Sequence, residues 1–217
     1  MYKLALIITG ILLVTVSSAV LAQDEQEKDF MEVAGFGGFS SPIGGINKWG
    51  SDTLAAKSGW DMGVDVGFFL TPSLVLGVNF VYNQFPIDNP NEPTSMHHRL
   101  YNPALYAKHY FFSESKFAPY LKAQAGFDNP KFATLVSDGG IDKYRELSYK
   151  PAFAIGCGAG LFMYTSDISG FFVEANIHHA FSTNSTATYQ GQEFPFRTSS
   201  TVIDVHAGLA AFFGSGK

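Results

Sequence analysis

The sequence predicts an all-β chain that folds as an eight-stranded antiparallel up-and-down transmembrane β-barrel. Between Trp60 and Phe85, apolar residues alternate with small or polar ones along two arms joined by Thr71-Pro72-Ser73. Side chains in a strand point to opposite faces with period two, and each arm has about eleven residues, enough for a tilted strand to cross a bilayer. Charged residues make up 15% of the chain, against roughly 25% in soluble domains. No apolar run after residue 22 is long enough for a membrane helix, so only a closed barrel would let this chain span lipid.

The first 22 residues are typical of a cleavable signal peptide. Lys3 gives a positively charged n-region, Leu4 to Val16 form a short apolar core, and Val20-Leu21-Ala22 precede the expected cleavage site. The alternative, a transmembrane anchor, is disfavoured because the apolar core is short. We therefore expect a signal peptide at 1–22, a short periplasmic segment at 23–29, the barrel at 30–213 and a tail at 214–217.

Eight segments carry strand patterns, and the connections between them alternate in length. The strands are expected at 30–40, 59–70, 74–85, 99–112, 117–127, 149–164, 171–183 and 200–213. The segment 99–112 is the weakest, because Pro103 breaks its ladder and both of its faces carry apolar residues. The connections 71–73, 113–116 and 165–170 are short, whereas 41–58, 86–98, 128–148 and 184–199 are long. This alternation predicts short periplasmic turns and four longer extracellular loops.

Aromatic residues gather near both ends of the expected strands. Phe-Phe doublets at 68–69, 111–112, 171–172 and 212–213 meet short turns or the C-terminus, at the level of Phe117, Tyr120, Phe162 and Tyr164. A second set, near the long loops, comprises Phe39, Trp60, Tyr82, Phe85, Tyr101, Phe127, Tyr149 and Phe181. We expect two aromatic girdles at the two bilayer interfaces. The alternative is a set of core aromatics scattered by chance.

Three features together resemble a known superfamily. They are the turn Leu70-Thr71-Pro72-Ser73-Leu74, the run Phe117-Ala118-Pro119-Tyr120-Leu121 and the alternating last strand that ends at Phe213. The chain resembles the small eight-stranded outer-membrane β-barrel proteins of the OmpA/OmpX-like superfamily along essentially all of its mature length. The resemblance implies a bacterial outer-membrane location and insertion by the barrel-assembly machinery, which reads a terminal aromatic residue. Here Gly214 to Lys217 follow Phe213, which departs from that pattern.

With the apolar face outward, a polar set of residues faces the lumen. The set comprises Glu32, Asp61, Asp65, Asn79, Lys108, Lys122, Gln124, Glu174, Asn176, His178, Asp204 and His206. The opposite phase would make a soluble lipocalin-like barrel, but its surface would then carry mostly Gly and Ala. An eight-stranded barrel is only just wide enough for side chains. We therefore expect a packed network in which Lys108 and Lys122 bridge acids, His178 and His206 add hydrogen bonds, and lumen glycines leave room for water.

The catalytic candidates are weak. Lipid A deacylases of the outer membrane carry a His and a Ser two residues apart on a late strand, but here His178 and Ser182 are separated by four residues, about 13 Å along a strand. His179 lies on the other face from Ser182. His97-His98 and His109 are too few for a metal site, and no phosphate loop or dinucleotide fingerprint is present. We expect no enzyme activity, no metal and no cofactor. Cys157, the only cysteine, has no disulfide partner and falls on the lipid face.

The function expected from these patterns is structural or loop-mediated binding by a barrel with a mostly closed polar lumen. A narrow channel for water or small solutes is one alternative, and a lipid A-modifying hydrolase is a second. The expected partners are outer-membrane lipids, lipopolysaccharide, the barrel-assembly machinery and an extracellular ligand at the loops. The formal net charge of −5 excludes a typical nucleic-acid binder, and we expect a monomer.

Overall fold

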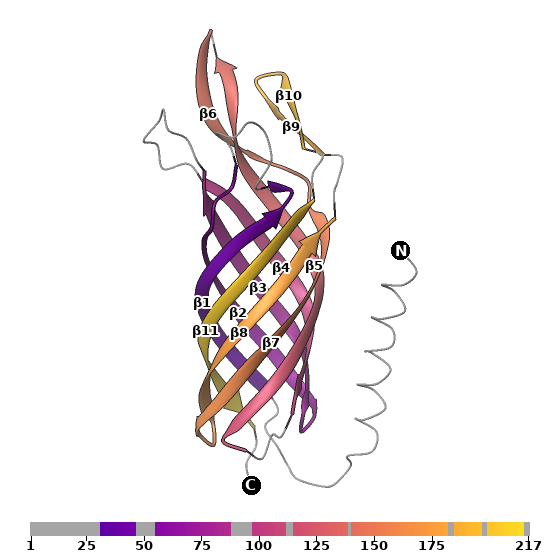
Figure 1. Ribbon diagram of the computed structural model, residues 1–217. Helices are drawn as coiled ribbons and strands as arrows, with labels where there is room; N and C mark the ends of the chain where they lie inside the picture. Colours follow the sequence, from indigo (N-terminus) through magenta and orange to yellow (C-terminus); the bar gives the residue numbers. More distant parts are fainter. Residues whose placement is uncertain are drawn as a thin grey trace.

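The computed structural model contains a closed barrel (Figure 1). It describes residues 31–46, 55–87, 97–111, 115–138, 140–181, 185–196 and 199–214, so the expected signal peptide and periplasmic segment lie outside the described residues. Within these ranges the barrel strands are β1 (Met31–Gly44), β2 (Gly59–Thr71), β3 (Leu74–Pro86), β4 (His97–Tyr110), β5 (Phe117–Asp138), β7 (Ala152–Ser166), β8 (Ser169–Ala180) and β11 (Ser200–Phe213).

Every barrel strand pairs antiparallel with its two neighbours. The order is β4-β3-β2-β1-β11-β8-β7-β5, and the additional β4–β5 pairing closes the sheet on itself. The predicted eight-stranded up-and-down fold is therefore confirmed. Pro103 pairs with Phe80 of β3, but the β4–β5 ladder is interrupted at Asn102 and Pro103, since proline lacks the N–H that a ladder needs. Among the described residues, no helix is long and apolar enough to cross a membrane.

Two of the connections expected to be loops contain strands. β6 (Ile141–Ser148) pairs with the distal half of β5, and β9 (Ser185–Tyr189) with β10 (Gln192–Phe196) forms a separate hairpin. The expectation of a plain loop at 128–148 is wrong because β5 continues to Asp138 and pairs in register with β6 from Lys131 onward. Gly140, at φ +80°, forms the turn into β6. Both hairpins extend past the barrel at its long-loop end (Figure 1).

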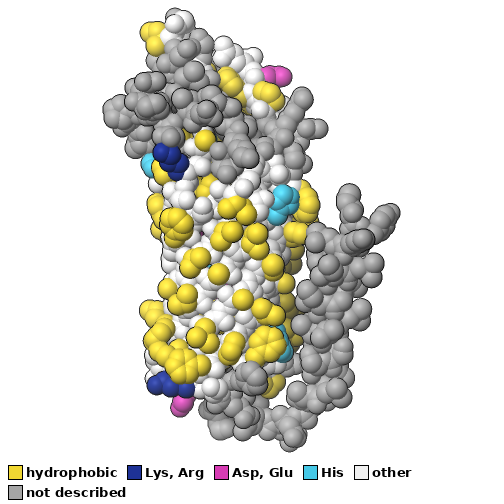
Figure 2. Space-filling model, viewed as in Figure 1, with side chains coloured by type: hydrophobic (Ala, Val, Ile, Leu, Met, Phe, Trp, Pro, Cys, Tyr) yellow, Lys and Arg dark blue, Asp and Glu magenta, His cyan; other side chains and the backbone are white. Residues whose placement is uncertain are grey.

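The outer wall of the barrel is apolar. Exposed large hydrophobic side chains occur on all eight barrel strands, as in Met62, Phe80, Leu105, Leu121 and Leu209. On the visible face, hydrophobic groups cover the wall, whereas Lys, Arg, Asp and Glu side chains appear only towards its ends (Figure 2). Cys157 is exposed on this wall. The apolar-out phase expected from the sequence is the one observed.

The aromatic doublets divide between the wall and the interior. Phe171 is 40% exposed, but its neighbour Phe172 is only 3% exposed, and Phe213 and Phe212 differ in the same way. Consecutive residues of a strand face opposite sides, so the two members of a doublet cannot both lie in a lipid-facing girdle. The girdle prediction is therefore wrong for one member of each of the doublets 68–69, 171–172 and 212–213. The doublet 111–112 is described only at Phe111, because Phe112 lies outside the described residues. The girdle prediction is also wrong for four buried residues: Tyr120, Phe162, Phe85 and Tyr149.

These inward rings close the barrel at its short-turn end. Tyr110, Tyr120, Phe162, Phe172 and Phe212 are all buried in one cluster, which we call the aromatic plug. Ring centroids lie 5.3 Å apart for Tyr110 and Tyr120 and also for Phe162 and Phe212. Aromatic pairs at such separations add about 0.5–1.5 kcal/mol beyond the area they bury.

A second buried cluster closes the long-loop end. This apolar cap comprises Ile46, Ala56, Phe85, Leu100, Phe132, Leu147, Tyr149, Ala187 and Val202, with Tyr189 and Phe194 packed against it. Its members come from barrel strands and from both protruding hairpins. The hairpins are thus attached to the barrel by apolar packing as well as by the chain itself. The interior between the aromatic plug and the apolar cap is polar.

Candidate functional site

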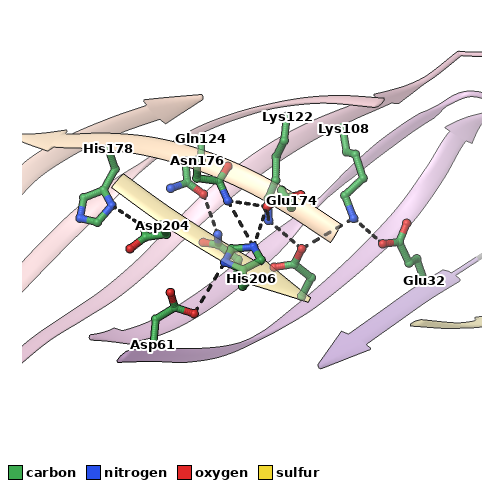
Figure 3. A network of polar contacts seen from close by, with 12 residues as sticks. Glu32, Asp61, Lys108, Lys122, Gln124, Glu174, Asn176, His178, Asp204 and His206 are labelled. Carbon is green, nitrogen blue, oxygen red and sulfur yellow. Dashed lines mark hydrogen bonds and ion pairs between the residues drawn. The ribbon is translucent and has the colours of Figure 1, made fainter. Parts of the chain in front are cut away.

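The polar residues expected in the lumen converge inside the barrel. All nine charged and histidine candidates are buried: Glu32, Asp61, Asp65, Lys108, Lys122, Glu174, His178, Asp204 and His206. They come from six strands, and their side chains point toward one another across the interior (Figure 3). The register sets Lys108 directly opposite Lys122 on β4 and β5, and Glu174 opposite His206 on β8 and β11. We call this set, with the polar side chains bonded to it, the lumen network.

The half of the lumen network next to the aromatic plug is a chain of ion pairs. Lys108 Nζ lies 2.5 Å from Glu32 Oε1 and 3.7 Å from Asp65 Oδ2. Lys122 Nζ lies 2.7 Å from Asp65 Oδ2 and 3.5 Å from Glu174 Oε1. Asp65 thus bridges two lysines that would otherwise repel each other on neighbouring strands.

Aromatic side chains join this chain of ion pairs to the plug. The Tyr110 hydroxyl donates to Glu32 Oε2 at 2.9 Å. The Lys122 ammonium lies 4.9 Å from the centre of the Tyr106 ring, and the Lys108 ammonium lies 5.2 Å from that of Tyr120. Such cation–π contacts contribute most where water is excluded.

The half next to the apolar cap is organised by histidines. His206 Nε2 lies 3.0 Å from Glu174 Oε1, and its ring stacks on Phe36 with 4.3 Å between centroids. His178 Nδ1 lies 3.2 Å from Asp204 Oδ2. Asp204 also accepts hydrogen bonds from Ser40 Oγ at 2.6 Å and Asn83 Nδ2 at 3.1 Å.

One charged member of the lumen network, Asp128, was not predicted from the sequence. Asp128 is buried, accepts from Asn102 Nδ2 at 2.5 Å and from Ser200 Oγ at 3.3 Å, and lies 3.7 Å from His178 Nε2. The strand was expected to end at residue 127, but Asp128 is in phase with Lys122, so extending the alternation by one residue would have found it. Gln124 does join the network, accepting from Asn79 Nδ2 at 2.7 Å.

Two of the lumen glycines make room for neighbouring side chains. A Cβ at Gly158 would overlap the Asn176 side chain, and one at Gly160 would overlap the Tyr120 ring. These positions lie on β7, which presents no charged side chain to the lumen within its described residues. The absence of a Cβ there lets side chains from β5 and β8 fill the barrel.

Asp61 stands apart from the other carboxylates. It is buried on β2, yet neither of its oxygens has a hydrogen-bond partner among the described residues, and its nearest ion-pair partner is His206 Nδ1 at 3.7 Å. Six buried carboxylates, completed by Asp128, face two lysines and two histidines in this network. A buried charge without close partners is costly, so Asp61 is the least stabilised member.

Comparisons with known proteins agree with this architecture. No family model matches the chain, and no curated protein matches it in sequence. Neisserial surface protein A superimposes with a TM-score of 0.57 at 14% identity, over 87% of this chain and 100% of that one. The outer-membrane protein AlkL in lipid bilayers superimposes with a TM-score of 0.55 at 14% identity, over 90% of this chain and 96% of that one. The outer-membrane protein OprG of Pseudomonas aeruginosa superimposes with a TM-score of 0.52 at 9% identity, over 88% of this chain and 100% of that one. This chain has the fold of the small outer-membrane β-barrel proteins.

The three catalytic candidates, His178, His179 and Ser182, are not brought together among the described residues. His178 faces the lumen, whereas the neighbouring His179 faces outward, with its Nδ1 2.8 Å from Thr201 Oγ1. Ser182 lies outside the described residues. The two histidines lie on opposite faces of β8, so they cannot act on one substrate together.

The loop histidines are also separated. His98 is buried, and its Nδ1 accepts a hydrogen bond from the Ala133 N–H at 3.2 Å. His97 and His109 pair with Pro86 and Leu74, at opposite ends of β3. Among the described residues, no group of three or more His, Cys, Asp and Glu side chains is placed to hold a metal ion.

Proposed function

We propose that this protein is a monomeric bacterial outer-membrane barrel with a closed lumen, which acts structurally and binds ligands through its loops. The observation that carries the proposal is the filled interior: the aromatic plug, the lumen network and the apolar cap follow one another along the barrel. Eight strands enclose only enough space for side chains. Residues 1–22 would direct export, and the barrel-assembly machinery would insert the chain.

The long-loop end supplies the proposed binding surface. The apolar cap holds Leu147 of β6 and Ala187 of β9 against the barrel. The Arg145 guanidinium lies 5.9 Å from the centre of the Tyr189 ring and so links the two hairpins. Ile141, near the tip of β6, is 62% exposed. Hairpins that are ordered before binding lose less conformational entropy when a partner docks, which supports an extracellular ligand at this end. The net negative charge of the chain does not favour nucleic acid as that ligand.

We also propose that the barrel is not an enzyme and uses no cofactor. The orientation of His178 and His179 to opposite faces supports this view. Lipid A from membranes with and without the folded protein should have the same mass. A mass change that disappears in Ser182→Ala would establish a lipid A hydrolase instead.

Conductance across planar bilayers tests the closed lumen. The full chain is refolded, and insertion is checked by the heat-modifiable gel mobility that a folded barrel shows. We expect no stepwise conductance from wild type, because ion pairs and rings occupy the interior. Steady conductance from verified, folded wild-type barrels would contradict the proposal and favour a channel.

A further inference from the structure

Three cationic residues lie together outside the barrel at its long-loop end. Arg99 of β4 pairs directly with Lys131 of β5. Both lie in the outward phase of their strands and are partly exposed. The Tyr149 N–H donates to the Pro130 carbonyl at 3.0 Å, which continues the β5–β6 register and brings exposed Lys150 beside β5. The cationic sector, as we call Arg99, Lys131 and Lys150, therefore spans neighbouring parts of one wall.

Among the described residues, a single carboxylate balances part of the charge of the cationic sector. Glu146 pairs with Arg99, its Oε2 lying 3.1 Å from Nη1. The Lys131 ammonium lies 5.2 Å from the centre of the Tyr101 ring. Neither Lys131 nor Lys150 forms an ion pair with another described residue. Like charges directly opposite each other on antiparallel strands are destabilising. Counted over the described residues, three cations and one carboxylate leave an excess charge of two, which an external anion would stabilise.

The cationic sector lies just beyond the apolar wall. On β4, Tyr101 lies two residues, about 7 Å, along the strand from Arg99 toward the barrel middle, followed by outward Pro103 and Leu105. The rings of Tyr101 and Tyr82 lie 5.2 Å apart between centroids. Those of Phe127 on β5 and Phe153 on β7 lie 6.0 Å apart. Aromatic belts mark the level where acyl chains meet headgroups. Lys and Arg just outside such a belt reach the headgroup phosphates with their charged ends.

Among the described residues, strands β8, β11 and β1 carry no outward Lys or Arg near the long-loop end, whereas Lys57, just before β2, is a further exposed cation there. On β8, β11 and β1, the outward residues near the long-loop end include His179, Thr201 and Ser41, none of which is Lys or Arg. An anion held by the cationic sector would contact the wall of the barrel rather than the lumen or the hairpin tips. In an outer membrane, a lipid headgroup would meet this part of the wall, whereas an extracellular peptide would meet the hairpins first.

We propose that Arg99, Lys131 and Lys150 bind a phosphate of lipid A in the surrounding outer leaflet. Arg99 offers a planar fork that suits a phosphate, and the lysines add point charges from the neighbouring chain segments. The inference rests on the proposed outer-membrane location. It assigns lipopolysaccharide contact to one sector of the wall instead of the whole circumference.

The test compares lipid A binding by the refolded full chain in detergent micelles. The variant is the double substitution Lys131→Gln and Lys150→Gln, which leaves the Arg99–Glu146 ion pair in place. Lys116→Gln, exposed at the opposite, short-turn end, is the matched control. We expect the double variant to bind lipid A at least about tenfold more weakly than wild type and than Lys116→Gln, since each cation near a phosphate contributes measurably. Dephosphorylated lipid A should bind wild type and variant equally weakly.

Unchanged lipid A affinity in the double variant would overturn the proposal. Competition by inorganic phosphate at concentrations equal to lipid A would also overturn it, because the site would then be one for dissolved anions. Cell fractionation separates this result from the proposed location. A barrel found in the outer membrane with unchanged affinity in the variant refutes the cationic sector alone, whereas a barrel found elsewhere refutes the proposed function.

Discussion

Asp65 and Asp61 form a matched pair for testing what the lumen network contributes to stability. They lie four residues apart on the inward face of β2, and both are buried. Replacing either with Asn keeps the shape of the side chain and removes its charge. Their surroundings differ, however: Asp65 Oδ2 lies 2.7 Å and 3.7 Å from two lysine ammoniums, whereas the nearest charged partner of Asp61 among the described residues is a histidine nitrogen at 3.7 Å.

The expected losses of stability differ accordingly. Removing one partner of a buried ion pair costs about 3–5 kcal/mol. After Asp65→Asn, Lys122 keeps Glu174 at 3.5 Å and Lys108 keeps Glu32, so we expect the lower end, about 3 kcal/mol, or roughly a hundredfold in the unfolding equilibrium. Asp61→Asn removes a buried charge that has no hydrogen-bond partner among the described residues. Its effect should lie within about 1 kcal/mol of zero, or be stabilising.

Reversible urea unfolding in lipid vesicles, followed by tryptophan fluorescence, measures both variants. Folded barrels are first verified by gel mobility, so that a failure of assembly is not read as a loss of stability. Equal destabilisation by Asp61→Asn and Asp65→Asn would refute the view that the lysine bridge, rather than burial alone, distinguishes these carboxylates.

Three further results are expected. Phe172→Ala should lose about 3–5 kcal/mol in the same assay because it opens a cavity in the aromatic plug, whereas Phe171→Ala, on the wall, should lose much less; equal losses would contradict the plug. Gly158→Ala should destabilise the barrel because its Cβ overlaps a buried amide, while Gly35→Ala meets nothing within 4 Å and serves as the control; a neutral Gly158→Ala would refute the close approach. A fluorophore attached to Cys157, the only cysteine, should be quenched by lipids brominated in mid-chain, and quenching by aqueous iodide instead would reverse the assigned outer face.

Much of the fold follows from local alternation. The two arms of the 60–85 hairpin and the apolar last strand predict both the strands and the face that meets lipid, because side-chain direction in a strand depends only on parity. The same rule places Lys108, Lys122 and Glu174 inside. It also shows why the prediction that whole doublets lie in a girdle is wrong: Phe171 and Phe172 are consecutive in the strand, so their side chains point to opposite faces.

The barrel class, the apolar wall and the inward charges follow from local sequence, since each depends on a period-two pattern within one strand. Which inward groups meet depends on the folded barrel. The bridging of Lys108 and Lys122 by Asp65, the isolation of Asp61 and the packing of β6 and β9 on the apolar cap all depend on register between strands. Register is set by the closure of the whole sheet, because a shift at one pairing changes the neighbours of every side chain around the barrel.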